Sequence, residues 1–137
     1  MRLFVTGGAG FIGSNYVHHV LRNTDDSVTV FDALTYAGNR ANLAEVEDDP
    51  RFTFVHGDIC DRAAVTEALE GHDVVVHFAA ESHVDRSLLD PDVFVRTNCS
   101  GTNVMCDVAH QLGVERFVHI STDEVYGSIE EGSFSEG

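Results

Sequence analysis

The most constraining feature of the sequence is a glycine-rich stretch that lies between two different apolar patterns. The run Leu3-Phe4-Val5 predicts a short strand, and Thr6-Gly7-Gly8-Ala9-Gly10-Phe11-Ile12-Gly13 follows it directly. The periodicity over residues 12–22 then predicts an amphipathic helix, with Ile12 on its apolar side. Glycines at this spacing let the backbone turn tightly and approach a pyrophosphate, which the N-terminus of a helix attracts. The stretch therefore predicts a dinucleotide-binding loop, and a plain tight turn is the alternative.

Apolar runs and helical patterns alternate along the whole chain. Further strands are predicted over residues 28–31, 52–55, 74–78 and 117–120, and further helices over 62–70 and 91–112. Asp61 and Asp90 occupy expected N-cap positions, and Gly71 and Gly113 end the same two helices. The inner face of the second of these helices is expected to carry Gly101, Val104, Met105, Val108 and Leu112. Strands that alternate with helices predict an α/β fold with a parallel sheet.

Two aspartates follow predicted strands where a dinucleotide would need hydrogen-bond acceptors. Asp32 ends the second strand, and a carboxylate there accepts hydrogen bonds from both hydroxyls of an adenosine ribose. The same charge repels a 2′-phosphate, and Ala33 offers no arginine to hold one, so NAD is expected rather than NADP. Asp58 follows the third strand and is predicted to meet the adenine amino group, with Ile59 against the ring. A capping role shared with Asp61 is the alternative for Asp58.

The composition excludes several classes of partner. The chain has 137 residues, of which 23 are acidic and 8 basic, and its net charge of -15 disfavours nucleic acid. The acids are scattered, which is typical of a proteome-wide bias such as adaptation to high salt. No apolar run approaches the roughly 20 residues of a membrane helix, and no signal-peptide pattern is present, so we expect a cytoplasmic protein without membrane partners.

Cysteines and histidines show no pattern typical of a metal site or a disulfide framework. The three cysteines are an odd number and lack C-x-x-C spacing, so we expect buried small side chains at Cys60, Cys99 and Cys106. His77 and His119 lie in predicted strands and are expected to be buried. Neighbouring histidines have no metal-ligand spacing with a third ligand, so we expect no metal.

Three longer motifs make the sequence similar to a known family. They are Asp32-Ala33-Leu34-Thr35-Tyr36-Ala37-Gly38-Asn39, the stretch from His77 to Ser87, and Ser121-Thr122-Asp123-Glu124-Val125-Tyr126-Gly127. With the three glycines, they resemble the extended short-chain dehydrogenase/reductases, and within them the nucleotide-sugar 4,6-dehydratases, over residues 1 to about 135. The resemblance implies a Rossmann-type, doubly wound parallel sheet that is truncated before the later strands and the substrate domain. It divides the chain into an incomplete NAD-binding domain, residues 1–127, and a truncated loop, residues 128–137.

The resemblance also implies a reaction and a set of site residues. NAD would take a hydride from the sugar C4, and water would then be lost across C5 and C6. The hydride would return to C6, which gives a 4-keto-6-deoxy sugar nucleotide. Asp123 would be the acid, Glu124 the base, and Thr122 would hydrogen-bond the sugar O4, while Ser82 would also contact substrate and His83 would lie near the sugar. The implied cofactor-binding residues are Gly7, Gly10, Phe11, Ile12, Gly13, Asp32, Ala33, Leu34, Thr35, Asp58, Ile59, Phe78, Ala79, Ala80, Ser82 and Thr97.

One geometric condition applies to the two catalytic carboxylates. Adjacent residues of a strand point to opposite faces, so Asp123 and Glu124 serve one substrate only if the chain leaves the strand before them. Two close carboxylates push one pKa upward, which would let one act as acid and the other as base. Two solvated acids in an acidic protein are the alternative.

Part of the family's catalytic apparatus is missing from the sequence. The family's Tyr-x-x-x-Lys pair is absent, since all eight basic residues are arginines. We therefore expect the amino-terminal part of a longer enzyme that is inactive by itself and that forms a homodimer when complete. A dTDP-sugar is the substrate that the resemblance favours, and UDP-glucose is the alternative. A related epimerase or decarboxylase, or a non-catalytic NAD-binding module, are the competing functions.

Overall fold

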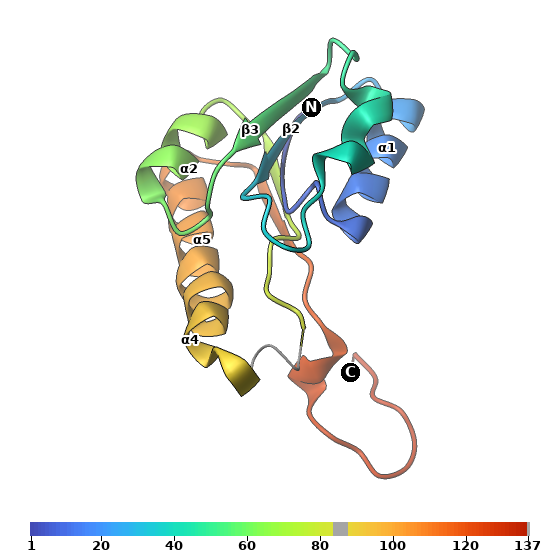
Figure 1. Ribbon diagram of the computed structural model, residues 1–137, viewed down its shortest axis with the longest axis vertical. Coiled ribbons are helices and arrows are strands. Elements are labelled where there is room, and N and C mark those ends of the chain that lie inside the picture. The colour runs from blue at the N-terminus through green and yellow to red at the C-terminus, as the bar shows by residue number, and fades with distance from the viewer. Residues whose placement is uncertain (84–87, 137) are drawn as a thin grey trace.

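The computed structural model describes residues 1–83 and 88–136 and contains one parallel sheet of five strands (Figure 1). The strands are β1 (Arg2–Thr6), β2 (Ser27–Asp32), β3 (Phe52–His56), β4 (Val74–His77) and β5 (Arg116–His119). Their order in the sheet is β3-β2-β1-β4-β5. The chain therefore builds outward from β1 to β3, crosses over β1, and builds in the other direction with β4 and β5. This doubly wound arrangement confirms the predicted Rossmann-type α/β fold.

Helices cover both faces of the sheet, as parallel strands require. On one face lie α1 (Phe11–Asn23) and the 3-10 helix η1 (Arg40–Val46), which bury Val17, Val20, Leu43 and Val46 against β1 and β2. On the other face lie α2 (Arg62–Leu69) and α5 (Thr102–Gln111), which stand together to the left of the sheet in Figure 1. Each face has its own apolar core, and the buried valines of β4 contribute to both.

The helix predicted over residues 91–112 is a continuous helical rod with an unpredicted irregularity. It begins as α4 (Pro91–Phe94), continues as the π-helical stretch η2 (Val95–Gly101), and ends as α5. Asp61 caps α2 as expected, because its side chain accepts hydrogen bonds from the amides of Ala63 and Ala64. Asp90 makes no side-chain cap bond, which differs from the prediction. A β-carbon on Gly101 would lie 2.6 Å from Cδ1 of Ile59, so the rod packs closely on the segment after β3 only because this residue is glycine.

Several predicted positions are wrong in detail. Ile12 is 64% exposed and Leu112 is 38% exposed, because the apolar stripe of each helix is narrower than the sequence pattern suggested. His119 is exposed at the outer strand β5, and Cys99 and Cys106 lie on the outward side of the rod, where burial was expected. All three cysteines are free thiols, and Cys60 is half-buried. The 3-10 helix η1 was not predicted, although Leu43 and Val46 recur at helical spacing.

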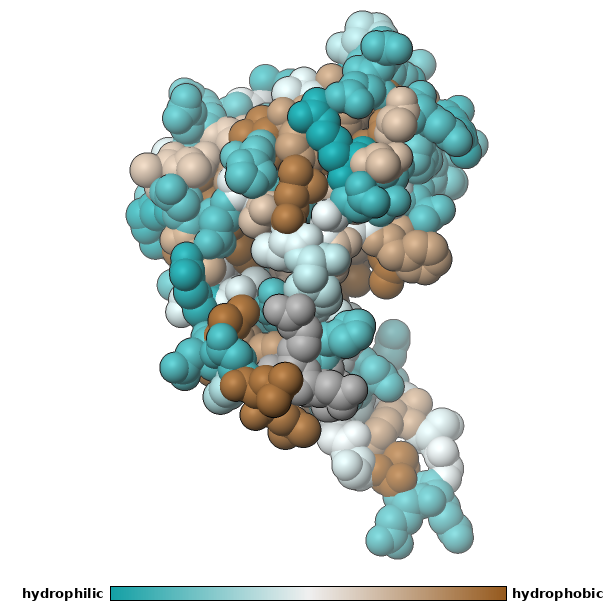
Figure 2. Space-filling view, viewed as in Figure 1, coloured by the Kyte–Doolittle hydropathy of each residue, from teal (hydrophilic) through white to brown (hydrophobic). Residues whose placement is uncertain are grey.

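Exposed apolar side chains gather at the end of the molecule beyond the sheet. Figure 2 shows a brown patch toward the lower end, and among the exposed apolar side chains Leu88 and Leu89 are 80% and 86% exposed. Val95 is 58% exposed on the following turn of the rod. Surfaces of this kind mark places where other protein packs. Within the part of the chain that the structure describes, no helix is both long and apolar enough to span a membrane.

Candidate functional site

The predicted site residues come together at one edge of the sheet. All five strands are parallel, so their carboxyl ends meet at the same edge, and β1 and β4 are neighbours there. The chain leaves β1 toward one half of the sheet and β4 toward the other, which opens a crevice between the two connections. Ligands of doubly wound sheets bind in such a crevice, at the point where the strand order reverses. Asp32 is the last residue of β2 at this edge, and four other predicted residues follow strands there: Gly7, Asp58, Ala79 and Thr122.

The glycine loop is folded too tightly for side chains. Gly7 has a φ of 68°, and a β-carbon there would lie 2.7 Å from the backbone nitrogen of Ala79. A β-carbon on Gly13 would lie 2.3 Å from the carbonyl oxygen of Gly7. Gly10 is the N-cap of α1 and provides no side-chain cap, so the first amides of the helix face outward without a side-chain acceptor. Phe11 and Ile12 are 83% and 64% exposed, which leaves this helix end accessible.

Asp32 is a buried carboxylate that organises the adjoining loops. It is 7% exposed, and its two oxygens accept hydrogen bonds from the backbone amides of Ala9, at 2.9 Å, and Leu34, at 2.8 Å. Leu34 adopts a φ of 50°, a left-handed conformation that is uncommon outside glycine and is typical of functional loops. Gly38 packs so closely that a β-carbon there would lie 2.7 Å from the Asp32 carboxylate. Ala33 is half-buried and Thr35 exposed beside this carboxylate.

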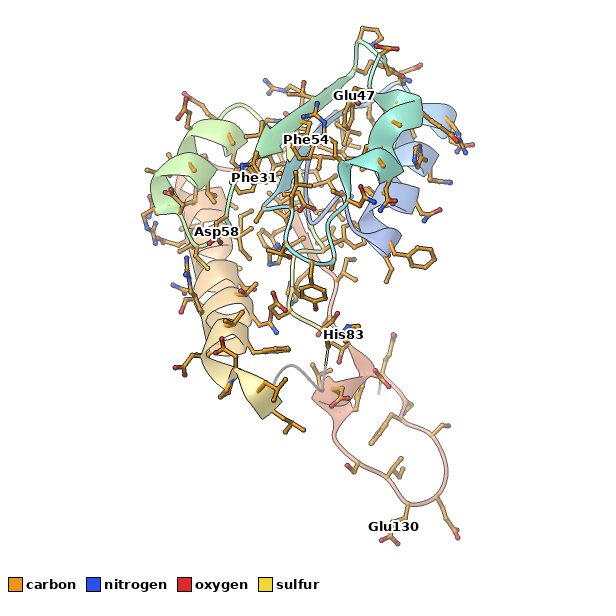
Figure 3. All side chains as sticks on the ribbon, viewed as in Figure 1. Phe31, Glu47, Phe54, Asp58, His83 and Glu130 are labelled. Atoms are coloured by element: carbon orange, nitrogen blue, oxygen red, sulfur yellow. The ribbon has the colours of Figure 1, made fainter. Side chains whose placement is uncertain are left out.

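Asp58 and Ile59 have separate roles in the structure. The Asp58 carboxylate accepts a hydrogen bond from the amide of Cys60 at 2.8 Å and pairs with the Arg96 guanidinium of the π-helical stretch at 2.9 Å. It takes no part in capping α2, which Asp61 does alone among the described residues. Ile59 is 5% exposed and belongs to the core, so its side chain is not positioned to lie against a ring. Figure 3 shows Asp58 between the end of β3 and the helical rod.

The segment after β4 is attached to its neighbours at both ends. At its start, the amide of Phe78 donates to the Thr6 carbonyl at 3.1 Å, and the amide of Ala79 donates to the Thr6 hydroxyl at 3.2 Å. At its end, the Asn98 side chain accepts from the amide of Glu81 at 2.9 Å and donates to its carbonyl at 2.8 Å. Thr6 and Asn98 were not identified from the sequence, although asparagine within a helix is itself a signal, because it is a poor helix former.

The remaining predicted residues of this segment differ in accessibility. Ala80 and Ser82 are exposed, while Ala79 and Thr97 are half-buried. The Phe78 ring packs on Tyr16 of α1 with a centroid separation of 5.4 Å. Residues 84–87, the end of the motif that begins at His77, lie outside the described residues. Figure 3 shows His83 beyond the carboxyl end of the sheet, and its ring meets Tyr36 edge-on at 5.7 Å.

The carboxylate pair lies on a turn and not on a strand. β5 ends at His119, and Asp123–Tyr126 form a 3-10 helix, η3, whose N-cap is Thr122. The Thr122 hydroxyl accepts a hydrogen bond from the Glu124 amide at 2.9 Å. The chain thus leaves the strand before Asp123, which meets the geometric condition for both carboxylates to serve one substrate. Both side chains are exposed.

The described side chains form no cluster of potential metal ligands. Across residues 1–83 and 88–136, no group of three or more histidine, cysteine or acidic side chains is arranged to hold an ion.

The fold and the glycine loop together define a nucleotide-binding α/β domain of the Rossmann type. Within that class, comparison with protein families gives a narrower result. The family model described as GDP-mannose 4,6 dehydratase matches residues 4–137, and the chain belongs to this family.

Individual relatives are similar in sequence to this chain over nearly its whole length. It is 58% identical over 137 residues to a dTDP-glucose 4,6-dehydratase of Streptomyces griseus, with 98% of this chain and 42% of that protein covered. It is 55% identical over 136 residues to the low-salt glycan biosynthesis protein Agl12 of Haloferax volcanii, with 99% and 44% covered. The chain thus spans less than half the length of these relatives.

Comparison with solved structures shows the same similarity at the level of the fold. The dTDP-glucose 4,6-dehydratase DesIV of Streptomyces venezuelae, solved with NAD and TYD bound, superposes with a TM-score of 0.94 at 57% identity, covering 98% of this chain and 43% of that one. A UDP-Glc/GlcNAc 4-epimerase of Campylobacter jejuni superposes with a TM-score of 0.90 at 30% identity, covering 98% and 41%. The fold is thus shared by dehydratases and epimerases, and the identity favours the dehydratases.

Proposed function

We propose that this chain is the NAD-binding part of a nucleotide-sugar 4,6-dehydratase that acts on dTDP-glucose. The observation that carries the proposal is the pair Asp123 and Glu124 on the η3 turn, at the same edge of the sheet as the glycine loop. An acid and a base are what elimination of water requires. The identity of 50–58% to dTDP-glucose 4,6-dehydratases of bacteria supports this substrate over a UDP-sugar.

The described residues fit a bound NAD. The glycine loop leaves no room for a β-carbon at Gly7 or Gly13, and the uncapped first turn of α1 suits a pyrophosphate. Asp32 retains lone pairs for the adenosine ribose hydroxyls, and Asp58 with the backbone of Ile59 would meet the adenine. The other residues that the resemblance implies for NAD binding are Phe11, Ile12, Ala33, Leu34, Thr35, Phe78, Ala79, Ala80, Ser82 and Thr97. When bound, the nicotinamide supplies reversible two-electron oxidation of a carbinol.

The residues of this chain would divide the elimination between them. Glu124 removes the C5 proton of the 4-keto sugar, and Asp123 gives a proton to the C6 hydroxyl, which leaves as water. The Thr122 oxygen already accepts the Glu124 amide, so its hydroxyl proton is available for the sugar O4. Ser82 is exposed near the end of β4, where it would contact the sugar.

The whole protein would complete this site. The chain contains no lysine, so the Tyr-x-x-x-Lys pair that the resemblance implies would come from the rest of a longer chain. Residues 1–127 would form the incomplete NAD-binding domain and 128–137 the loop that follows. The exposed Leu88, Leu89 and Val95 favour packing against further protein, as a homodimer would provide. A cytoplasmic location stays a prediction.

Product analysis of the full-length protein tests the proposal. Asp123→Asn and Glu124→Gln should each stop the loss of water from dTDP-glucose, while calorimetric NAD binding stays as in the unmodified protein. Glu130→Gln is the matched control, because Glu130 lies exposed at the far loop (Figure 3). Variants that still dehydrate would refute the roles of the pair. A product of unchanged mass would instead support a 4-epimerase.

A further inference from the structure

We propose that His77 is a positioning residue for the dinucleotide site, held between Thr6 and Thr102 so that it fixes the hydroxyl that binds the Ala79 amide. The inference rests on the proposed function, because it concerns the NAD site of that enzyme. It assigns a role to a buried hydrogen-bond network that none of the predicted site residues explains.

His77 connects three elements of the fold. It lies at the end of β4 and is 1% exposed. Its Nδ1 lies 2.6 Å from the hydroxyl of Thr6, the last residue of β1, and its Nε2 lies 3.1 Å from the hydroxyl of Thr102, the first residue of α5. One side chain thus links the central strand, its neighbour, and the helix that covers them.

The hydrogen bonds assign the protons on the imidazole. Thr6 is fully buried, and its oxygen already accepts the Ala79 amide at 3.2 Å, so its own proton needs an acceptor. Nδ1 of His77 is the acceptor that the described contacts provide, so the single N–H proton of the neutral ring lies on Nε2 and is donated to Thr102. Only a neutral ring satisfies both contacts in this way.

The surroundings keep the ring neutral. Burial, helped by the nearby His119, lowers the pKa of His77 to about 4. The His119 ring stacks on it at 5.2 Å and Phe117 lies at 5.8 Å, both from β5, while β1 and α5 present the hydroxyls of Thr6 and Thr102. None of these groups supplies a negative charge that would hold an imidazolium.

The network acts on the site through Ala79. Thr6 is the residue before Gly7, and a β-carbon on Gly7 would lie 2.7 Å from the Ala79 nitrogen. The hydroxyl that His77 orients therefore helps to keep the segment after β4 against the glycine loop, beside the bond from the Phe78 amide to the Thr6 carbonyl. If that hydroxyl turned away, the Ala79 amide would lose its acceptor, and the segment after β4 would move away from the glycine loop.

The test removes one hydroxyl without changing side-chain shape. Thr102→Val in the full-length protein should weaken NAD binding by roughly tenfold in calorimetry, the value of one buried hydrogen bond. Thr102→Ser should restore the affinity. Thr66→Val is the matched control, because the Thr66 side chain is exposed and its hydroxyl donates to the Arg62 carbonyl within α2. In the unmodified protein, nitrogen NMR should show His77 protonated on Nε2.

The outcomes separate the two proposals. NAD affinity that is unchanged by Thr102→Val, in a folded protein, would overturn the positioning role, and so would a ring protonated on Nδ1. If Thr102→Val fails to fold, the nitrogen NMR of the unmodified protein decides, because a ring protonated on Nδ1 cannot accept the Thr6 hydroxyl proton and would overturn the positioning role. An unmodified protein that binds no NAD would refute the proposed function itself, and the inference with it.

Discussion

Two glycines of this chain share a backbone conformation but differ in their surroundings, which allows the cost of close packing to be measured by itself. Gly7 has a φ of 68° and Gly113 a φ of 70°. A β-carbon on Gly7 would lie 2.7 Å from the Ala79 nitrogen and 2.9 Å from the Phe78 carbonyl carbon. A β-carbon on Gly113 would meet nothing within 4 Å. Alanine at each position therefore carries the same conformational strain, and only Gly7→Ala adds a clash.

The magnitudes follow from these two terms. A left-handed alanine costs about 1–2 kcal/mol, and the lower entropy of its unfolded chain returns about 0.4–1 kcal/mol. Gly113→Ala should therefore lower the free energy of unfolding by about 1 kcal/mol. Gly7→Ala presses on backbone atoms that cannot rotate away, and overpacking adds about 1–3 kcal/mol. The two variants should differ by about 2 kcal/mol.

Urea unfolding followed by far-ultraviolet circular dichroism suits this comparison, because the chain has no tryptophan to report by fluorescence. Both variants should keep the slope of the unmodified protein and differ only in midpoint. Equal losses in the two variants would refute the reasoning, since they would mean that the approach of Ala79 to the glycine loop costs nothing to disturb. Gly7→Ala should also abolish NAD binding, whereas Gly113→Ala should leave it intact.

Two further predictions concern buried ionisable groups. The folded-state pKa of His77 is about 4 against an ordinary 6.5, so the unfolded chain takes up the proton first as pH falls. The contribution of a neutral His77 to the free energy of unfolding should be fully present above pH 6.5 and should be lost, by about 3 kcal/mol, as the pH falls toward 4. A His77→Gln protein whose stability declines as steeply with pH would contradict this. Asp32→Asn should lower stability by about 1–3 kcal/mol and weaken NAD binding, because an amide cannot accept from the amides of both Ala9 and Leu34. Asp48→Asn, at an exposed aspartate, is its control, and equal urea midpoints for the two variants would argue against the role of Asp32.

The order of elements was predictable from local pattern, but their ends were not. Glycine spacing and alternating apolar runs predicted the strands and helices, because short buried strands and amphipathic helices leave distinct periodicities. The π-helical stretch over Val95–Gly101 left no such trace. Its last residue, Gly101, lies close to Ile59 and Cys60, a contact between distant parts of the chain that local pattern does not reveal. The burial of Cys99 and Cys106 was wrong for a similar reason, because the direction that each turn of a long helix faces is decided by its tertiary contacts.

The candidate site could be predicted where one residue type is demanded by geometry. Gly7, Gly13 and Asp32 lie where close backbone approach or a buried acceptor is required, and both kinds of residue are visible in sequence. Thr6 and Asn98 could not be found in this way, because threonine and asparagine occur in many settings and their roles here come from partners far along the chain. Likewise, the turn that carries Glu124 depends on where β5 ends, which local propensity leaves uncertain by several residues.

The amides that hold Asp32 also bear on the kinetics of nucleotide capture. The carboxylate is held in one rotamer by contacts from the glycine loop and from the loop after β2, both formed by the protein alone. A ribose would meet an acceptor that is already aimed, so little side-chain entropy is left to lose on association. The slow part of capture should then be the approach of an anionic nucleotide to a chain of net charge -15, a step that added salt accelerates.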